Sequence, residues 1–257
     1  MRQKSPRGSG RKALERIGTL TRVRRYPVKS MAGEDLPEAR VSFAGLVGDR
    51  VYAFIDQKNH SDFPWMTGRQ SREMILFRPQ FLDAPLVAEE IPDTEKYLTN
   101  LTTPEGEKFR MGDPQLTEYL EKRFGRSLKL RFSERCMTDA RPISIFGLAT
   151  VRRLSEETGM ELDERRLRAN FYARWEENRA FYEDELVGRE LRIGEIVTLQ
   201  VVKKNARCVM INLDPETAAP SPVVFEKVAR CHDGLAGVYA AVLREGIVKA
   251  DDPIYLI

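Results

Sequence analysis

The stretch Ile196-Val197-Thr198-Leu199-Gln200-Val201-Val202 is dominated by β-branched and apolar residues, a composition typical of a strand. The next residues, Lys203-Lys204-Asn205-Ala206-Arg207-Cys208, form a polar, basic turn that ends on a cysteine. Turn-forming and acidic residues follow over residues 212–217. The sequence therefore predicts a strand that carries the Cys208 thiol near its end, beside the guanidinium of Arg207. Positive charge favours the thiolate, which is both the nucleophile and the metal ligand.

Short strands of this kind recur along the chain, separated by glycines and prolines. Residues 17–23 alternate between apolar and polar side chains, and residues 51–56 form a strongly apolar run. Between them, residues 45–50 (Gly-Leu-Val-Gly-Asp-Arg) predict a tight turn. Further strands are expected near residues 76, 86–87, 97–98, 171–175, 190–194, 237–242, 246–248 and 254–257. The pattern predicts a mainly β protein with a few helices.

The helical pattern is confined to three segments. Residues 114–124 have helical spacing and end at Gly125, a residue typical of helix C-caps. Residues 146–158 form a second predicted helix that Gly159 closes, and residues 163–167 form a short third one. The chain therefore divides into two β-rich halves with few helices.

The charge distribution separates the first residues from the rest of the chain. The formal net charge is +3, but residues 1–16 alone carry +5 and the remainder −2. We predict that residues 1–16 are a disordered basic tail, with weak contact to an acidic partner or a membrane surface as the alternative. The near-neutral body argues against a nucleic-acid partner, which needs a basic face on the fold. Behind the tail we predict two β-barrel-like domains, at residues 17–130 and 131–257, with their seam near residues 128–138.

Composition sets further bounds. A hydrophobic content of 42% supports a packed core. No run is long enough to span a membrane, and no apolar segment follows the basic start as in a secretory signal, so we predict a cytoplasmic protein. Three cysteines without a CxxC pair, and two histidines, argue against a disulfide framework and against structural zinc.

Several polar clusters fall at predicted strand ends or turns, and most of them pair a cation with an amide or hydroxyl group. Such sets suit a ligand with a phosphate and a hydrogen-bonding heterocycle, because arginine forks and lysine charges bind phosphate oxygens. The alternative is that each cluster is an ordinary solvated turn. The clusters are Lys29-Ser30, Asp49-Arg50, Thr67-Gly68-Arg69-Gln70, Arg168-Ala169-Asn170 and Asn205-Ala206-Arg207-Cys208.

The same residues carry a resemblance to a known family. The first half resembles the MOSC N-terminal β-barrel domain, through Tyr26-Pro27-Val28-Lys29-Ser30, residues 45–50 and Met66-Thr67-Gly68-Arg69-Gln70. The second half resembles the MOSC domain, through Arg168-Ala169-Asn170-Phe171, residues 181–194, Ala206-Arg207-Cys208 with Asp214-Pro215, and residues 246–257. Within that family the chain is similar to the mitochondrial amidoxime-reducing component and to bacterial reductases of N-hydroxylated bases.

The resemblance implies a molybdenum-molybdopterin cofactor, with Cys208 as the one protein thiolate on the metal. It implies that Lys29, Ser30 and Arg50 contact the pterin and its phosphate, and that Thr67, Arg69, Gln70, Arg168, Asn170 and Arg207 line the same pocket. The implied reaction is the two-electron reduction of amidoximes, hydroxylamines and N-hydroxy bases, with chemistry that belongs to the cofactor. Asp214 is the candidate proton donor; the alternative is a turn aspartate before a proline.

The resemblance also implies a partner. The chain has no cysteine cluster for an iron–sulfur centre and no expected haem, so electrons must come from a separate protein of ferredoxin, flavodoxin or cytochrome b5 type. The alternative function is a carrier of the cofactor, or of sulfur as a persulfide on Cys208. MOSC domains also end the molybdenum cofactor sulfurases, so pyridoxal phosphate is a family-level association, but their pyridoxal-phosphate domain is missing here.

The remaining cysteines and the tryptophans receive structural interpretations. Cys136 is expected to be a small buried residue. Residues 230–234, with Cys231 and His232, are interpreted as a mobile loop near the site, and two ligands do not make a metal site. Trp65 and Trp175 are expected to be core or rim aromatics rather than cofactor stackers.

Overall fold

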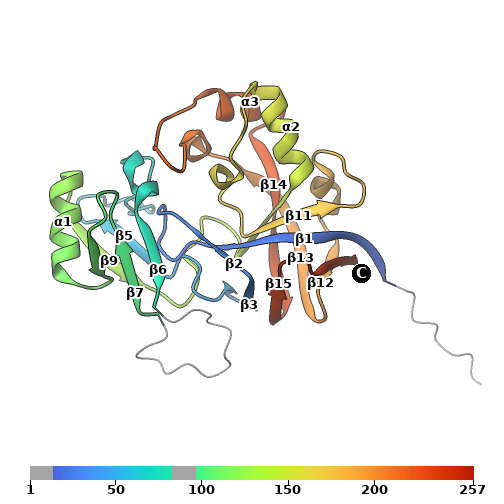
Figure 1. The fold of residues 1–257 in the computed structure, drawn as a ribbon, viewed down its shortest axis with the longest axis horizontal. Coiled ribbons are helices and arrows are strands. Elements are labelled where there is room, and N and C mark those ends of the chain that lie inside the picture. The colour runs from blue at the N-terminus through green and yellow to red at the C-terminus, as the bar shows by residue number, and fades with distance from the viewer. Residues whose placement is uncertain (1–13, 83–96) are drawn as a thin grey trace, which may run out of the picture.

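The computed structural model describes residues 14–82 and 97–257 (Figure 1). Strands dominate the described part, and its three α-helices are α1 (Pro114–Phe124), α2 (Leu148–Thr158) and α3 (Val223–Cys231). Short 3-10 helices connect other elements: η1 (Arg72–Leu76), η2 (Glu164–Leu167), η3 (Tyr182–Leu186) and η4 (Val209–Asn212). The predicted mainly β fold class is confirmed. None of the helices in the described ranges has the length and apolar character needed to span a bilayer.

A closed barrel of seven strands forms the larger body. The strand order is β11-β10-β14-β13-β12-β16-β1-β2, and a further pairing of β1 with β11 closes the first seven into a ring. Strands β10 and β11 pair in parallel, whereas the other strand pairs of this sheet are antiparallel. The strands are β1 (Glu15–Arg25), β2 (Glu34–Leu36), β10 (Ile143–Gly147), β11 (Phe171–Trp175), β12 (Glu190–Ile193), β13 (Val197–Ala206), β14 (Leu235–Arg244) and β16 (Pro253–Leu256).

The barrel closes where β1 lies between β11 and β16. Gly18 faces Trp175 on one side and Ile254 on the other. A Cβ atom on Gly18 would approach the Arg174 carbonyl and the Trp175 ring to 2.8 Å. Only glycine fits this close approach. One glycine therefore permits the contact that turns an open sheet into a barrel.

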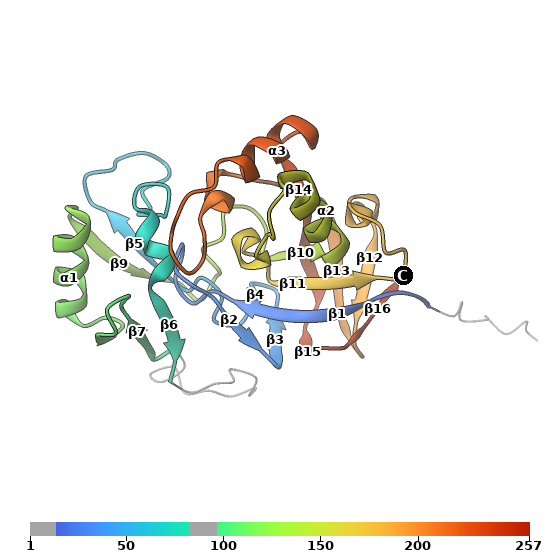
Figure 2. The ribbon, with the colours of Figure 1, turned by 45° about the horizontal axis from the view of Figure 1, so that its top comes forward.

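Two small sheets, β5-β9 and β6-β7-β8, form the second body together with α1, and this body lies beside the barrel in Figures 1 and 2. A third small sheet, β15-β3-β4, packs on the barrel, because Ala39, Val41, Leu46 and Val248 belong to the barrel core. The strands of the three sheets are β3 (Glu38–Ser42), β4 (Gly45–Leu46), β5 (Tyr52–Asp56), β6 (Arg78–Phe81), β7 (Thr99–Thr102), β8 (Lys108–Arg110), β9 (Leu128–Phe132) and β15 (Gly246–Lys249). In the third sheet, β15 from the second half of the sequence pairs with β3 from the first half.

Alternation along β13 explains the barrel core. Val197, Leu199 and Val201 are buried and point inward, whereas the residues between them are partly exposed. Barrel residues from the other strands complete this cluster. A separate cluster, built around Phe54 and Phe77, joins β5, η1 and α1 in the smaller body. Each body therefore has its own apolar core, and polar turns from both meet between them.

The helices compare closely with the expectations. Helix α1 is confirmed at its predicted bounds, with the Asp113 side chain accepting from Gln115 N at one end and Gly125 in the left-handed region at the other. The second predicted helix begins two residues later, at Leu148, because Phe146 and Gly147 belong to β10. The predicted short helix is the 3-10 helix η2.

Three expectations need correction or fall outside the described ranges. The loop predicted at residues 230–234 is wrong at its first two residues, because Arg230 and Cys231 belong to α3, a helix whose Val224 and Val228 are buried, whereas residues 232–234 form a turn. The tail predicted over residues 1–16 is too long, since Glu15 and Arg16 already pair with β16. Its remaining residues 1–13, and the strand expected at 86–87, lie outside the described residues.

The predicted domain boundary between residues 130 and 131 stays a prediction. Strands β1 and β2 come from the first half of the sequence, yet they belong to the sheet of the second half. Residues 15–25 therefore complete the barrel although they precede the smaller body along the chain.

Candidate functional site

A polar cavity of about 160 Å³ lies where turns from the two bodies meet. We name it the Cys208 cavity. It brings together most of the residues that the sequence nominated, from segments far apart in the chain. The predicted residues that line it are Lys29, Ser30, Arg50, Thr67, Arg69, Arg168, Asn170, Arg207 and Cys208, whereas Gln70 and Asp214 do not.

Lys29 and Ser30 follow the end of β1. Lys29 N donates to Tyr52 O at 2.8 Å, which fixes the turn against β5, and Ser30 adopts a left-handed φ of 65°. The Lys29 ammonium donates to Met137 O at 2.8 Å and forms an ion pair with Asp139. Burial lowers the pKa of Lys29, and Asp139 only partly opposes that shift. A buried ammonium therefore faces the cavity with a single carboxylate partner.

Arg50 lies at the end of the glycine-framed turn. Its Nη1 donates to Asp49 Oδ2 at 2.5 Å, and the fully buried Asp49 also accepts from Tyr26 N at 2.8 Å. Burial opposes the charge on Arg50, but Asp49 outweighs this effect and raises the pKa of Arg50. Arg50 Nη2 also donates to Arg168 O at 3.1 Å, across the boundary between the two bodies.

Arg168 sits at the end of η2 with a left-handed φ of 52°. Its guanidinium lies 4.5 Å from the centre of the Tyr26 ring, and Arg50 lies 4.6 Å from the same ring centre. Within the described residues, Arg168 Nη2 makes no hydrogen bond. Burial, with the nearby charge of Arg50, lowers the pKa of Arg168 to about 10. Among the described residues no carboxylate forms an ion pair with Arg168, although the nearby charge of Asp49 partly opposes the lowering of its pKa, and the residue lines the cavity.

Asn170 uses its amide within the barrel. Its Oδ1 accepts from Ser144 N at 3.2 Å and from Ser144 Oγ at 3.0 Å, and its Nδ2 donates to Arg24 O at 3.3 Å. These bonds tie β10, β11 and β1 together at the cavity. Asn170 thus positions the cavity wall as well as lining it.

Cys208 lies just beyond the end of β13. The preceding Arg207 donates from Nη2 to Leu167 O at 2.6 Å, while its Nε makes no hydrogen bond to any described residue. Burial lowers the pKa of Arg207. Asn205 is 1% exposed, and its Oδ1 likewise has no partner in the described ranges. The half-buried Cys208 thiol is therefore surrounded by buried polar atoms that are ready to bind a ligand.

Two nominated residues, Gln70 and Asp214, do not line the cavity and have other roles. Gln70 Oε1 accepts from Thr67 N at 3.0 Å and from Thr67 Oγ1 at 2.5 Å, so it closes its own turn. Asp214 Oδ1 accepts from the backbone of Glu216 and Thr217 at 3.0 Å each, and Oδ2 pairs with Arg166 at 2.9 Å. These contacts match the turn-aspartate alternative, and the structure does not bring Asp214 to the cavity as a proton donor would require.

Sequence reasoning missed several lining residues. Asp139 is the carboxylate among the lining residues, and Lys29 with Arg50 and Arg69 lowers its pKa against the opposing effect of burial. Its segment has no periodic pattern, and the only signal was a run of polar residues before Pro142. The missed polar lining residues are Thr138, Asp139, Arg141, Ser144 and Tyr239, whereas Asn205 was part of a predicted polar cluster but had no assigned role.

The other two cysteines, Cys136 and Cys231, do not line the Cys208 cavity. Cys136 is half-buried, and burial with the charge of Asp49 raises its pKa to about 12. Cys231 is exposed, and its neighbour His232 pairs with Glu157 at 2.7 Å and stacks on Phe181. Trp175 is in the barrel core, as expected.

Comparison with known families follows the two halves of this architecture. The MOSC N-terminal beta barrel domain matches residues 17–118, and the MOSC domain matches residues 121–255. This chain belongs to the MOSC family. The two matched ranges contain every residue of the Cys208 cavity, so the cavity is assembled from both family domains.

Relatives within the MOSC family include two proteins named mitochondrial amidoxime reducing component 2. The one from Bos taurus is 24% identical over 294 residues, covering 95% of this chain and 85% of the relative. The one from Rattus norvegicus is 24% identical over 297 residues with the same coverage. Among solved structures, the YUAD protein from Bacillus subtilis aligns with a TM-score of 0.51 and 14% identity, over 95% of this chain and 97% of that one. That likeness supports the fold.

Proposed function

We propose that this MOSC protein binds molybdenum-molybdopterin in the Cys208 cavity and reduces N-hydroxylated compounds such as amidoximes, hydroxylamines and N-hydroxy bases. The observation that carries the proposal is the cation excess around a thiol. Lys29, Arg50, Arg69, Arg141, Arg168 and Arg207 line the cavity with one carboxylate, Asp139. The MOSC family is associated with the molybdenum cofactor, and the relatives' names support an amidoxime substrate.

The donor set fits a phosphate-bearing pterin. Arg168 Nη2 and Arg207 Nε are buried donors without partners among the described residues, and a phosphate accepts from such groups. Asn205 Oδ1 is a buried acceptor without a partner in the same part of the chain, and a heterocycle N–H can donate to it. A buried polar group without a hydrogen bond costs free energy, so a ligand that supplies both kinds of partner is favoured.

Individual residues then receive roles. Arg168, Arg207, Lys29, Ser30 and Arg50 would hold the phosphate and pterin, with Thr67 and Arg69 completing the opposite wall. Cys208 would supply the thiolate ligand to molybdenum, a soft ligand for this metal. When bound, the cofactor supplies the two-electron chemistry. The protein would orient it, because Arg50 is held by Asp49 and a backbone carbonyl, and Arg207 by another backbone carbonyl, before any ligand arrives.

A separate electron donor completes the proposal. Cys208 is half-buried, and the next residue, Val209, is 46% exposed. A ferredoxin-, flavodoxin- or cytochrome b5-type protein can therefore approach the edge of the cavity where the thiol lies.

Metal analysis tests the proposal directly. Protein made in a host that synthesises molybdopterin should contain about one molybdenum per chain, and Cys208→Ala should lose it. Cys231→Ala is the matched control, because that thiol is exposed at the end of α3. Loaded protein should reduce benzamidoxime with an artificial electron donor, and Cys208→Ser should not.

The carrier function predicts a different result. A folded, molybdenum-free protein with a persulfide on Cys208 would contradict the reductase and favour a sulfur carrier. Loaded protein that releases its cofactor to an acceptor, but fails to reduce benzamidoxime, would favour a cofactor carrier.

A further inference from the structure

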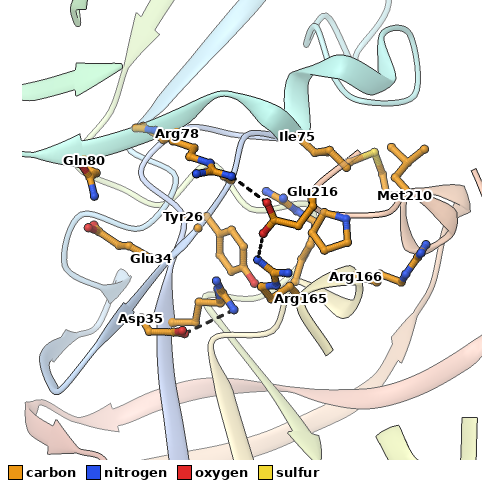
Figure 3. Close-up of a pocket in the computed structure, with 17 residues that line it drawn as sticks. Tyr26, Glu34, Asp35, Ile75, Arg78, Gln80, Arg165, Arg166, Met210 and Glu216 are labelled. Carbon is orange, nitrogen blue, oxygen red and sulfur yellow. Dashed lines mark hydrogen bonds and ion pairs between the residues drawn. The ribbon is translucent and has the colours of Figure 1, made fainter. Parts of the chain in front are cut away.

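A second, larger cavity of about 430 Å³ lies against the Cys208 cavity and shares Arg168 and Met210 with it (Figure 3). We name it the Arg24 cavity. Strand β1 and the turn after it form one wall, η1 and β6 form another, and η2 with residues 210–216 forms the third. Like the Cys208 cavity, it is built from both bodies of the molecule.

Its lining is rich in arginine. Five arginines and three carboxylates line the cavity. Three ion pairs extend outside the lining: Glu34 pairs with Arg25, Arg165 with Asp163, and Arg166 with Asp214. Arginines still outnumber carboxylates when these partners are included, which favours an anionic ligand. The lining arginines are Arg24, Arg78, Arg165, Arg166 and Arg168.

Two of these arginines are buried and incompletely hydrogen-bonded. The Arg24 side chain is 7% exposed, and its Nε and Nη1 make no hydrogen bond with the described residues. Asp35 Oδ1 lies 3.5 Å from Nη1, an ion pair rather than a hydrogen bond. The Arg166 side chain is 4% exposed, and its Nε has no partner within the same ranges, although Nη1 donates to Asn212 O at 2.6 Å. An oxyanion that enters the cavity would satisfy such donors.

Glu216 already occupies an anion position across this cavity. Figure 3 shows its carboxylate between Arg78 and Arg165, with an ion pair to each. The distance from Arg78 Nη2 to Glu216 Oε2 is 2.8 Å. The Glu216 and Arg78 side chains are 49% and 64% exposed, so water screens this bridge and a competing anion can displace it.

Apart from Gln80, the other side chains of the lining are mainly apolar. Ile75, Met210 and Leu213 lie on one side, and the Tyr26 ring lies near the arginines. An apolar or aromatic body can rest against these side chains while its anionic group reaches the guanidinium groups. The lining thus favours an amphipathic anion over a bare inorganic ion.

We propose that the Arg24 cavity is a second ligand site, which binds a small organic oxyanion with an aromatic body, either a carboxylate or a phosphate monoester. The ligand displaces Glu216 from Arg78 and Arg165 and hydrogen-bonds to Arg24. The site stands on this geometry alone and does not depend on the reductase function.

Calorimetric titration with benzoate and with phenyl phosphate, in parallel, tests the site and distinguishes the two anions. Glu216→Gln should tighten binding about threefold to tenfold, because it removes the competing carboxylate from two exposed ion pairs. Arg24→Gln and Arg78→Gln should weaken binding, Arg24→Gln by about tenfold or more, since it removes a charge-assisted donor. Arg230→Gln is the control, because Arg230 is 77% exposed on α3 and pairs only with Glu226 among the contacts described for it.

The variants separate this cavity from its neighbour. Binding that disappears in Lys29→Gln but survives in Arg24→Gln would locate the ligand in the Cys208 cavity and overturn the proposal. Unchanged or weaker binding in Glu216→Gln would also overturn it, as would no binding of either anion by the parent protein and this variant. A misfolded variant would not bind the anion more tightly, so misfolding cannot explain the expected gain in affinity of Glu216→Gln.

Discussion

The two walls of the Cys208 cavity differ in how the charges of their cationic side chains are compensated. On the wall from the smaller body, Lys29 pairs with Asp139 and Arg50 pairs with Asp49. On the barrel wall, Arg207 is held by a backbone carbonyl, and Arg168 forms no ion pair with a carboxylate of the described residues. Removing a carboxylate-paired charge leaves its partner buried and uncompensated, whereas removing an unbalanced charge does not. The first wall should therefore govern stability, and the second should govern binding of an anion.

The largest expected effect is on stability, at Asp49. Asp49→Asn should lower the free energy of unfolding by about 3 kcal/mol, because a buried arginine loses its counter-charge. Chemical denaturation followed by tryptophan fluorescence measures the change. Asp233→Asn, at an exposed aspartate after α3, is the matched control. A loss as small as in the control would mean that Asp49 and Arg50 contribute no more than a surface pair.

The next effect is on the cofactor rather than on folding. Arg168→Gln should weaken retention of molybdopterin about tenfold or more, since charge-assisted hydrogen bonds contribute about 1.5–3 kcal/mol each. Its thermal stability should be unchanged or higher, because an unbalanced buried charge is removed. Cofactor content after gel filtration and thermal unfolding give the two readouts, with Arg152→Gln on α2 as the control. A variant with lower thermal stability that retains as much cofactor as the parent protein would contradict the roles assigned to the two walls.

A smaller effect is expected at Asp139, whose side chain is 55% exposed. Asp139→Asn should destabilise the protein at neutral pH by about 0.5–1 kcal/mol, after allowance for solvent screening. Because the pKa of Asp139 is lowered in the folded protein, its contribution is present above its unfolded pKa and is lost as pH falls through the folded value. The difference between variant and parent should thus narrow below about pH 4 in thermal scans at several pH values. A difference that grows on acidification would contradict this assignment.

The smallest effect is a labelling pattern. At pH 8, iodoacetamide should modify the exposed Cys231 well before Cys136, because a pKa of about 12 keeps the Cys136 thiol protonated. Peptide mass spectrometry gives both rates. Since burial and then Asp49 raise that pKa, Asp49→Asn should speed the labelling of Cys136. Equal rates at the two cysteines in the parent protein would contradict the environment described for Cys136.

The strands and α1 were predictable because their signals are local. Alternation along residues 197–206 and the Asp113 and Gly125 caps of α1 lie within single short windows. Helix α3 was missed because its apolar stripe is short and the prolines at 220 and 222 resemble loop residues. Pairing of β1 with β11 depends on tertiary closure, which no local window contains.

The site was predictable where a turn motif carries both the fold and the chemistry. Each predicted turn motif lies near the end of a strand or helix that borders the Cys208 cavity, and this brings together residues 29–30, 50, 168 and 207–208. Asp139 was missed because its segment has no periodicity. Arg24 occupies a strand position, and nothing local indicates that its side chain is buried. Asp214 was nominated for its place after the thiol, but its Oδ1 is bound within its own turn and its Oδ2 pairs with Arg166.

Closure of the barrel by β1 and β16 has a consequence for synthesis on the ribosome. Strand β1 is the first described strand to leave the exit tunnel and β16 is the last, yet they are neighbours. One edge of β1 therefore has no partner for most of the time during which the chain is elongated, and an unpaired edge invites association with other nascent chains. Contacts between residues so distant in sequence also slow folding. Emergence of β16, rather than emergence of the first half of the sequence, should be the event that commits this protein to its native barrel.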